Sequence, residues 1–274
     1  LSGIDVSASG VKAVRLSENT HGLVLASYAE VRMPSGAYVD GEVVNNSAVS
    51  EAISSAAKTA GIFSANAALP ESKSLLFETV VPGTNANEWR IAVEQQLDEL
   101  IPIPPQETAF DIVKVGKEDR GTRIAGVGFA DRIVNDTLSV FDQANVVARS
   151  LEGEAFAMAR SLLPKGDDST TLVIDIGRTT TKIAIIAGRI PRFSTTIGIG
   201  GHALTLAVQK HFGVTEAEAR KIKAERGIVP SAGNDDYLSA MLSTVSAIRD
   251  EIGTRLEYWQ SKAVQTREHE PISQ

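Results

Sequence analysis

Two stretches of this chain repeat one polar pattern between apolar runs. Ile4–Lys12 reads as an apolar strand, an aspartate, a hydroxyl-rich turn and a lysine before a second apolar run, and Ile174–Lys182 reads the same way. The aspartate and the lysine are seven residues apart in both copies, which predicts two hairpins of the same geometry. One such hairpin alone is most simply a solvated turn. Two copies, one opening each half of the chain, indicate a duplicated domain that holds one ligand between two polar turns.

The residue types in these turns suit a metal-bound polyphosphate. An aspartate at the end of a strand can bind a divalent cation, and the amides and hydroxyls of the next turn can hold phosphate oxygens. Lysine can neutralise the charge of a terminal phosphate. The candidates that follow from the pattern are Asp5, Ser7, Ser9 and Lys12 in the first copy, and Asp175, Thr179, Thr180, Thr181 and Lys182 in the second.

A glycine pair is the next candidate. Gly200 and Gly201 precede a helix predicted over 202–212. Glycine lets the backbone approach a phosphate, and the N-terminus of the helix then points at the anion. A lone glycine pair is more often a tight turn, and this pair gains weight because it follows the second hairpin closely.

Two acidic residues each allow two interpretations. Glu218 can form a capping box with Thr215 at the start of a predicted helix, or Glu218 and Lys221, on one helical face, can bind the ribose and base of a nucleotide. Spacing alone favours the cap. Glu154 opens a predicted helix, where an acid complements the helix dipole. Alternatively, it positions a water molecule for attack on a terminal phosphate.

Charge and composition exclude several classes of protein. The formal net charge is −7, from 27 basic and 34 acidic residues, and no basic cluster is present. Neither nucleic acid nor anionic lipid is therefore expected as a direct partner, because both require a basic surface. The chain contains no cysteine, which excludes disulfides and thiolate metal sites. No apolar run reaches the roughly 20 residues that cross a bilayer, so a cytoplasmic protein is predicted.

The pattern of apolar residues predicts an α/β protein with an inserted α+β subdomain. Residues 1–72 are predicted to form strands and a helix over 46–60, and residues 151–168 are predicted to complete the same subdomain. The insert covers 73–150, and its helix is expected to run unbroken over 87–100. The second half divides into 169–200 and 201–274. It ends in a long helix over about 235–264 and a polar tail from 266 that is expected to fray.

These elements, in this order, resemble the actin-like ATPase superfamily, whose fold is a duplicated ribonuclease H-like domain. Within it the chain resembles the PilM family of type IV pilus assembly proteins, and the resemblance covers essentially the whole chain. The stretches that carry it are Leu76–Pro82, Leu100–Pro104 with Asp111, Glu154–Ala157, Val173–Gly177, Ile199–Gly201 with Thr205, and Ala217–Lys221.

The resemblance implies ATP and Mg²⁺ as ligands, with at most slow hydrolysis. Asp5 and Asp175 would organise Mg²⁺, and Glu154 and Asp175 would be the catalytic residues. The phosphates would be held by Ser7, Ser9, Lys12, Gly177, Thr179 and Thr181. Gly200, Gly201, Glu218 and Lys221 would lie along the nucleotide.

The resemblance also implies a protein partner and subdomain names. Residues 1–72 with 151–168 would be subdomain 1A, 73–150 subdomain 1C, 169–200 an incomplete 2A and 201–274 subdomain 2B. Subdomain 1C, with 1A, would grip the N-terminal cytoplasmic peptide of a PilN-like inner-membrane protein. The protein would then sit at the cytoplasmic face of the membrane through that partner alone, in a type IV pilus or a related type II secretion system, and self-association would be possible.

Two departures from the family pattern stand out. Ser7 replaces the glycine usual in the first hairpin. A Gly-Gly adenosine motif would follow the long helix, but the sequence stops at Gln274, which predicts a truncated chain or weak nucleotide binding. The alternatives to a nucleotide-binding adaptor are an FtsA-like cell-division protein, a small-molecule kinase of the same superfamily, and a degenerate scaffold.

Overall fold

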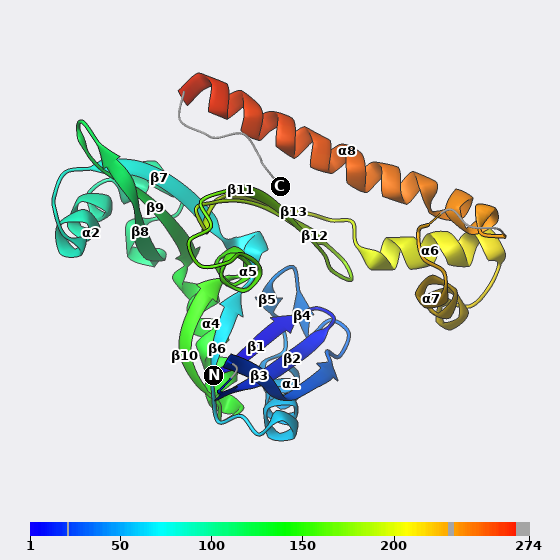
Figure 1. Ribbon diagram of the computed structural model, residues 1–274. Helices are drawn as coiled ribbons and strands as arrows, with labels where there is room; N and C mark the ends of the chain where they lie inside the picture. Colours follow the sequence, from blue (N-terminus) through cyan, green and yellow to red (C-terminus); the bar gives the residue numbers. More distant parts are fainter. Residues whose placement is uncertain (21, 230–232, 267–274) are drawn as a thin grey trace. The chain divides into compact units, whose positions relative to one another are not determined.

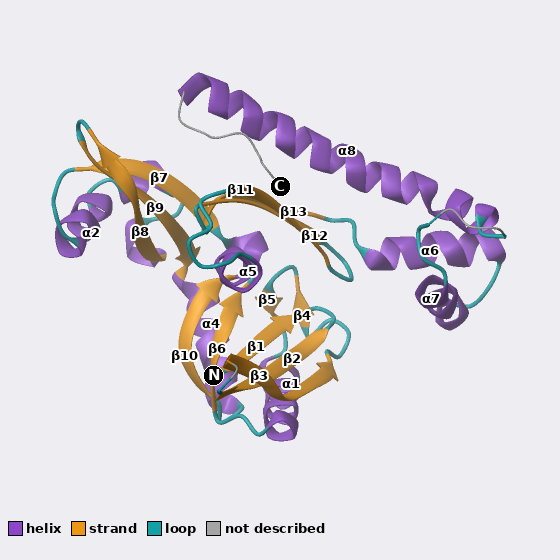
Figure 2. Cartoon of the chain, in the orientation of Figure 1, coloured by secondary structure: helices purple, strands orange, loops and turns teal. Residues whose placement is uncertain are grey.

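The computed structural model describes residues 1–20, 22–229 and 233–266, so the tail expected to fray lies mostly outside the described residues. The chain divides into two compact units (Figure 1). The first unit consists of Leu1–Ser169 with Ala184–Ser194, and the second of Thr170–Ile183 with Thr195–Gln274. Both units contain strands and helices (Figure 2), in agreement with the predicted α/β class.

A five-stranded sheet is the centre of the first unit, in the order β10-β6-β1-β2-β3. Its strands are β1 (Ser2–Ser7), β2 (Gly10–Asn19), β3 (Gly22–Arg32), β6 (Ser64–Leu69) and β10 (Val147–Gly153). β1 and β2 form the predicted antiparallel hairpin, whereas β1, β6 and β10 are parallel to one another. The three parallel strands therefore end at one edge of the sheet.

Two helices, α1 (Asn46–Ala60) and α4 (Asp131–Gln143), bury this sheet's apolar side chains in one core. Asn45 caps α1 by accepting a hydrogen bond from the amide of Ala48, and Gly61 ends the helix with a φ of 66°. The left-handed conformation suits glycine, which has no Cβ. Gly61 is thus the C-cap of α1.

Within the predicted insert, residues 75–130 form a second sheet in the order β7-β9-β8, with two helices against one face, and the term insert refers to these residues from here on. Its elements are β7 (Leu75–Val81), α2 (Ala86–Glu94), α3 (Leu97–Leu100), β8 (Thr108–Glu118) and β9 (Gly121–Ala130). The prediction of one unbroken helix over 87–100 was wrong, because the backbone leaves the helical conformation at Gln96. The side chain of Gln96 accepts a hydrogen bond from the Thr79 hydroxyl and donates one to the Ala92 carbonyl.

A short hairpin and three further strands complete the β-structure. The hairpin is formed by β4 (Tyr38–Val39) and β5 (Glu42–Val43). The sheet β11-β12-β13 is built from β11 (Thr170–Ile176), β12 (Thr181–Ala187) and β13 (Ile190–Ile197). α5 (Glu154–Leu162) precedes this sheet in the chain, and its first residue directly follows β10.

The second unit ends in three helices, α6 (Gly201–Phe212), α7 (Glu216–Glu225) and α8 (Asp235–Thr266). They share a small apolar core made of Leu204, Val208, Ala219, Tyr237 and Met241. Within the described residues, no helix combines the length and the apolar character needed to cross a bilayer.

Close packing in the insert makes the replacement of Gly126 a test of the fold. A Cβ at Gly126 would lie 2.1 Å from the ring of Phe77, whereas a Cβ at Gly116, in the same sheet, would meet nothing within 4 Å. We expect Gly126→Ala to lower the free energy of unfolding by about 1–3 kcal/mol, as overpacked cores do. Urea denaturation measures this, and Gly116→Ala is the matched control. Equal stability of the two variants would contradict the packing described.

The ion pairs of Glu42, on β5, should make the stability of the protein depend on pH. Hydrogen bonds from Arg132, and then from Lys73, hold the pKa of Glu42 well below its ordinary 4.5, at about 2. Because this pKa is depressed in the folded protein, the stabilisation is present above pH 4.5 and is lost as the pH falls towards 2. These ion pairs are partly exposed, so the effect should stay below about 1 kcal/mol. Urea unfolding of Glu42→Gln and the parent should differ at pH 6 and converge near pH 2.

Candidate functional site

The carboxyl edge of the first sheet carries the first predicted cluster. Asp5 on β1 lies directly opposite Lys12 on β2, as the hairpin prediction requires. In the turn between them the Ser7 hydroxyl lies 2.9 Å from that of Ser9 and donates a hydrogen bond to the carbonyl of Gly10. One carboxylate, two hydroxyls and one lysine therefore lie within a single hairpin.

Two buried glutamates extend this edge along the parallel strands. Glu154 follows β10 and Glu71 follows β6, and both are less than a tenth exposed. Burial raises the pKa of the nearby Tyr38 phenol, and the charges of Glu154 and then Asp5 add to this rise. The structure thus brings Glu154 to the neighbourhood of Asp5. Glu71 and Tyr38 were not predicted, since neither belongs to a recognisable motif.

The second hairpin, in the second unit, holds the other predicted cluster. Asp175 and Lys182 form an ion pair, with 3.7 Å between Oδ2 and Nζ. The amide of Gly177 donates to the carbonyl of Thr180, which closes the turn, and Thr179 is exposed. Thr181, by contrast, is fully buried and donates its hydroxyl to the carbonyl of Ile199. Its hydroxyl therefore anchors the segment that leads to the glycine pair.

The glycine pair packs directly against this turn. The amide of Gly201 donates to the carbonyl of Gly177, and that of His202 donates to the carbonyl of Arg178. A Cβ at Gly200 would lie 2.7 Å from the Gly177 carbonyl oxygen and 2.8 Å from that of Arg178. Only glycine fits so close to another backbone segment. The turn of the hairpin and the N-terminus of α6 are therefore one structural piece.

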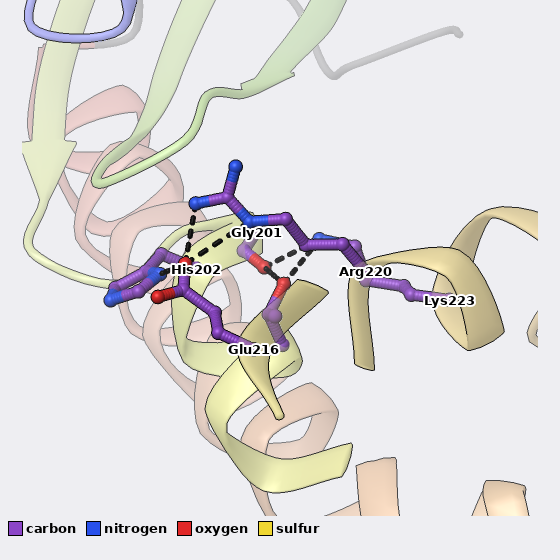
Figure 3. Close-up of polar contacts among 6 residues, drawn as sticks. Gly201, His202, Glu216, Arg220 and Lys223 are labelled. Atoms are coloured by element: carbon purple, nitrogen blue, oxygen red, sulfur yellow. Dashed lines mark hydrogen bonds and ion pairs between the residues drawn. The ribbon is translucent and has the colours of Figure 1, made fainter. Parts of the chain in front are cut away.

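The helix α7 adds side chains to this piece, but not those that the sequence suggested (Figure 3). Lys223, rather than Lys221, reaches it, with its ammonium 2.6 Å from the carbonyl oxygen of Gly201 and 2.9 Å from the Thr205 hydroxyl. Burial lowers the pKa of Lys223, and the charge of Arg220 adds to this. Lys221 is exposed and lies 3.8 Å from Glu225. The signal for Lys223 is its helical spacing, which places it two turns after Glu216 on the same side of α7.

Glu218 makes the capping box. Its carboxylate accepts hydrogen bonds from the amide and the hydroxyl of Thr215, and its own amide donates to that hydroxyl. These bonds also hold its pKa below the ordinary value, the bond from the Thr215 amide first. The cap that spacing favoured is thus present. A contact of Glu218 with a nucleotide stays a prediction.

A charged pair on α7 lies beside the start of α6. Glu216 accepts a hydrogen bond from the Arg220 guanidinium, with 3.0 Å to Nε, and its carboxylate is 3.7 Å from Nδ1 of His202 (Figure 3). The bond from Arg220 keeps the pKa of Glu216 below its ordinary value. This places an acid and a base on α7 beside the first residues of α6.

The donor types of both hairpins suit Mg²⁺ and phosphate. Carboxylates and hydroxyls are the oxygen ligands that Mg²⁺ prefers, and lysine and backbone amides bind phosphate. Within the described residues, no group of three or more His, Asp or Glu side chains is arranged to hold a metal ion by itself.

Comparisons with known proteins agree with this architecture. The chain resembles the protein in a solved "PilM-PilN type IV pilus biogenesis complex", with 22% identity, a TM-score of 0.78, and coverage of 94% of this chain and 77% of that one. Ethanolamine utilization protein EutJ from Carboxydothermus hydrogenoformans matches with 15% identity over 94% of this chain and 71% of that one, at a TM-score of 0.54.

MreB5 of Spiroplasma citri, solved with ADP, matches with 14% identity over 93% of this chain and 78% of that one, at a TM-score of 0.52. These likenesses identify the actin-like fold, which the sequence predicted. The model of the family described as type IV pilus assembly protein PilM matches residues 3–268, nearly the whole chain. The chain therefore belongs to the PilM family of type IV pilus assembly proteins.

Proposed function

We propose that this protein is a nucleotide-binding adaptor of the type IV pilus machinery, which binds ATP with Mg²⁺ and a peptide of an inner-membrane partner. The observation that carries the nucleotide half is the repeated hairpin with an aspartate and a lysine. In the second unit that hairpin is joined to the glycine-led N-terminus of α6. Membership of the PilM family supports the assignment to pilus assembly.

Each group at the hairpins has a distinct role in this proposal. Bound Mg²⁺ would supply positive charge that offsets the charge of the phosphates. Asp5 and Asp175 would hold the cation, directly or through water, and Lys12 would neutralise a terminal phosphate. Amides of the turn that follows Gly177 would bind phosphate oxygens, and Gly200 and Gly201 would let the backbone come close to them. Thr181 and Lys223 would contribute indirectly, because their side chains hold the backbone of these two turns in place.

The peptide half of the proposal rests on the insert. α2 and α3 cover the face of its sheet that carries Phe77 and Ile112. Side chains alternate along a strand, so Val80 and Val113 point to the opposite face, where both are more than a third exposed. Exposed apolar side chains on a sheet face suit an extended peptide with apolar residues. We propose that the N-terminal cytoplasmic segment of a PilN-like protein binds there and holds this protein at the inner membrane.

Nucleotide binding is tested first. We expect Asp5→Asn and Asp175→Asn each to raise the Kd for ATP with Mg²⁺ at least about tenfold, which corresponds to a loss of about 1.4 kcal/mol. Removing Mg²⁺ with EDTA should weaken binding by the parent to a similar degree. Isothermal titration calorimetry measures both effects. Asp168→Asn, an exposed acid in the linker before β11, is the matched control.

Two results would contradict this half of the proposal. One is a parent protein that binds no ATP with Mg²⁺. The other is an Asp175→Asn variant that binds as tightly as Asp168→Asn does.

The peptide site has its own test. A charge at Val113 should oppose the burial of apolar peptide side chains, so we expect Val113→Glu to weaken binding of the partner's N-terminal peptide at least about tenfold. Fluorescence anisotropy with a labelled peptide and the full chain measures this. Phe63→Glu is the control, because Phe63 is 84% exposed and precedes β6 at the end of the sheet remote from the insert. Equal affinities of the two variants would exclude this face.

A further inference from the structure

Two buried glutamates stand where β6 and β10 end. These strands are neighbours, and Leu69 and Gly153, their last residues, are paired in register. After β6 the chain passes through the short 3₁₀ helix Glu71–Lys73 and enters the insert at β7. After β10 it begins α5 at Glu154. The root of the insert and the first turn of α5 therefore lie side by side.

The two side chains hold each other's backbone. Oε2 of Glu154 accepts a hydrogen bond from the amide of Glu71 at 3.0 Å, and Oε2 of Glu71 accepts one from the amide of Ala155 at 2.8 Å. The other oxygen of Glu71 accepts from the Ser74 hydroxyl at 2.7 Å. The first amides of a helix have no partner within it, so each carboxylate caps the element that the other begins.

These reciprocal hydrogen bonds matter for stability because both side chains are buried: Glu71 is 4% exposed and Glu154 is 8% exposed. A buried charge persists only with hydrogen-bond partners, and a buried amide that loses its acceptor is costly. Removing either carboxylate would leave the backbone amide that it accepts from without a partner. The root of the insert and the start of α5 should consequently move as one piece.

Position at the sheet edge gives the pair its relevance to ligand binding. β1 is paired with β6 in parallel, so Asp5 lies on the strand next to the one that Glu71 follows. The β4–β5 hairpin contacts the root of the insert, since the Lys73 ammonium is 2.6 Å from the carboxylate of Glu42 on β5. The Arg132 guanidinium pairs with the same carboxylate.

We propose that Glu71 is a positioning residue that acts through Glu154, an inference that rests on the proposed nucleotide function. By capping α5 and holding the Glu154 carboxylate with its own amide, Glu71 keeps Glu154 at the edge of the sheet where Asp5 lies. The same bonds join this carboxylate to the root of the insert. The placement of Glu154 thus depends on a residue outside the predicted nucleotide motifs.

Amide hydrogen exchange of the full chain, read over the first turn of α5, tests the proposal. Without ligand, Glu71→Ala should speed exchange of the Ala155 amide by about tenfold or more, because its acceptor is lost. Glu71→Gln, whose amide oxygen can still accept, should stay within about threefold of the parent. Glu88→Ala is the matched control, since Glu88 also accepts from a backbone amide, that of Thr84, but at the start of α2.

A second arm adds ATP with Mg²⁺ at saturating concentration. The parent and Glu71→Gln should both gain protection over 154–158, and Glu71→Ala should lose that gain while its Kd for ATP changes less than about threefold. If Glu71→Ala does not fold, Glu71→Asp, which keeps the charge on a shorter side chain, replaces it in both arms. Its oxygen should fall short of the Ala155 amide.

The outcomes separate the two proposals. A parent that binds no ATP would contradict the nucleotide function, while the ligand-free arm would still decide whether Glu71 holds α5. Unchanged exchange at Ala155 in Glu71→Ala would overturn the reciprocal cap. Faster exchange with full ligand-induced protection would overturn the positioning role and leave Glu71 a merely structural cap.

Discussion

The parallel pairing of β1, β6 and β10 is the constraint on which the first unit depends. Parallel strands end at the same edge of a sheet, and in open α/β sheets that edge is where ligands bind. Here the pairing gathers Asp5, Glu71 and Glu154, which are far apart in the sequence. The core formed by α1 and α4 holds these strands in register and leaves their polar ends at the edge.

In the second unit, backbone contacts bring the polar turn and the start of α6 together. Its hairpin turn is closed by the bond from Gly177 to Thr180, and the same turn then receives the amides of Gly201 and His202. Because a Cβ at Gly200 would collide with two carbonyl oxygens, this fit exists only with glycine at that position. Lys223 adds a half-buried ammonium that bonds to the carbonyl of Gly201 and so joins α7 to the start of α6. The two hairpins are alike in pattern, but different neighbours support them.

Local patterns explain how much of this was predictable. The hairpin register with Asp5 opposite Lys12, the cap at Gly61 and the capping box of Thr215 and Glu218 follow from adjacent residues, and all three are present. The break at Gln96 was not predictable, because its side chain bonds to Thr79 on β7. Glu71 was not predictable for the same reason, because its partners Glu154 and Ala155 lie more than 80 residues away in the sequence.

The sequence by itself therefore determined the α/β class, the repeated hairpins and the resemblance to the PilM family, since each depends on short-range spacing or on motif order. Tertiary structure decided which polar groups act together. It placed Lys223 at the glycine pair while Lys221 faces solvent, and it bound Glu154 to the amide of Glu71. The physical reason is burial: a polar group removed from water must find a partner, and only the folded chain determines which partner lies within reach.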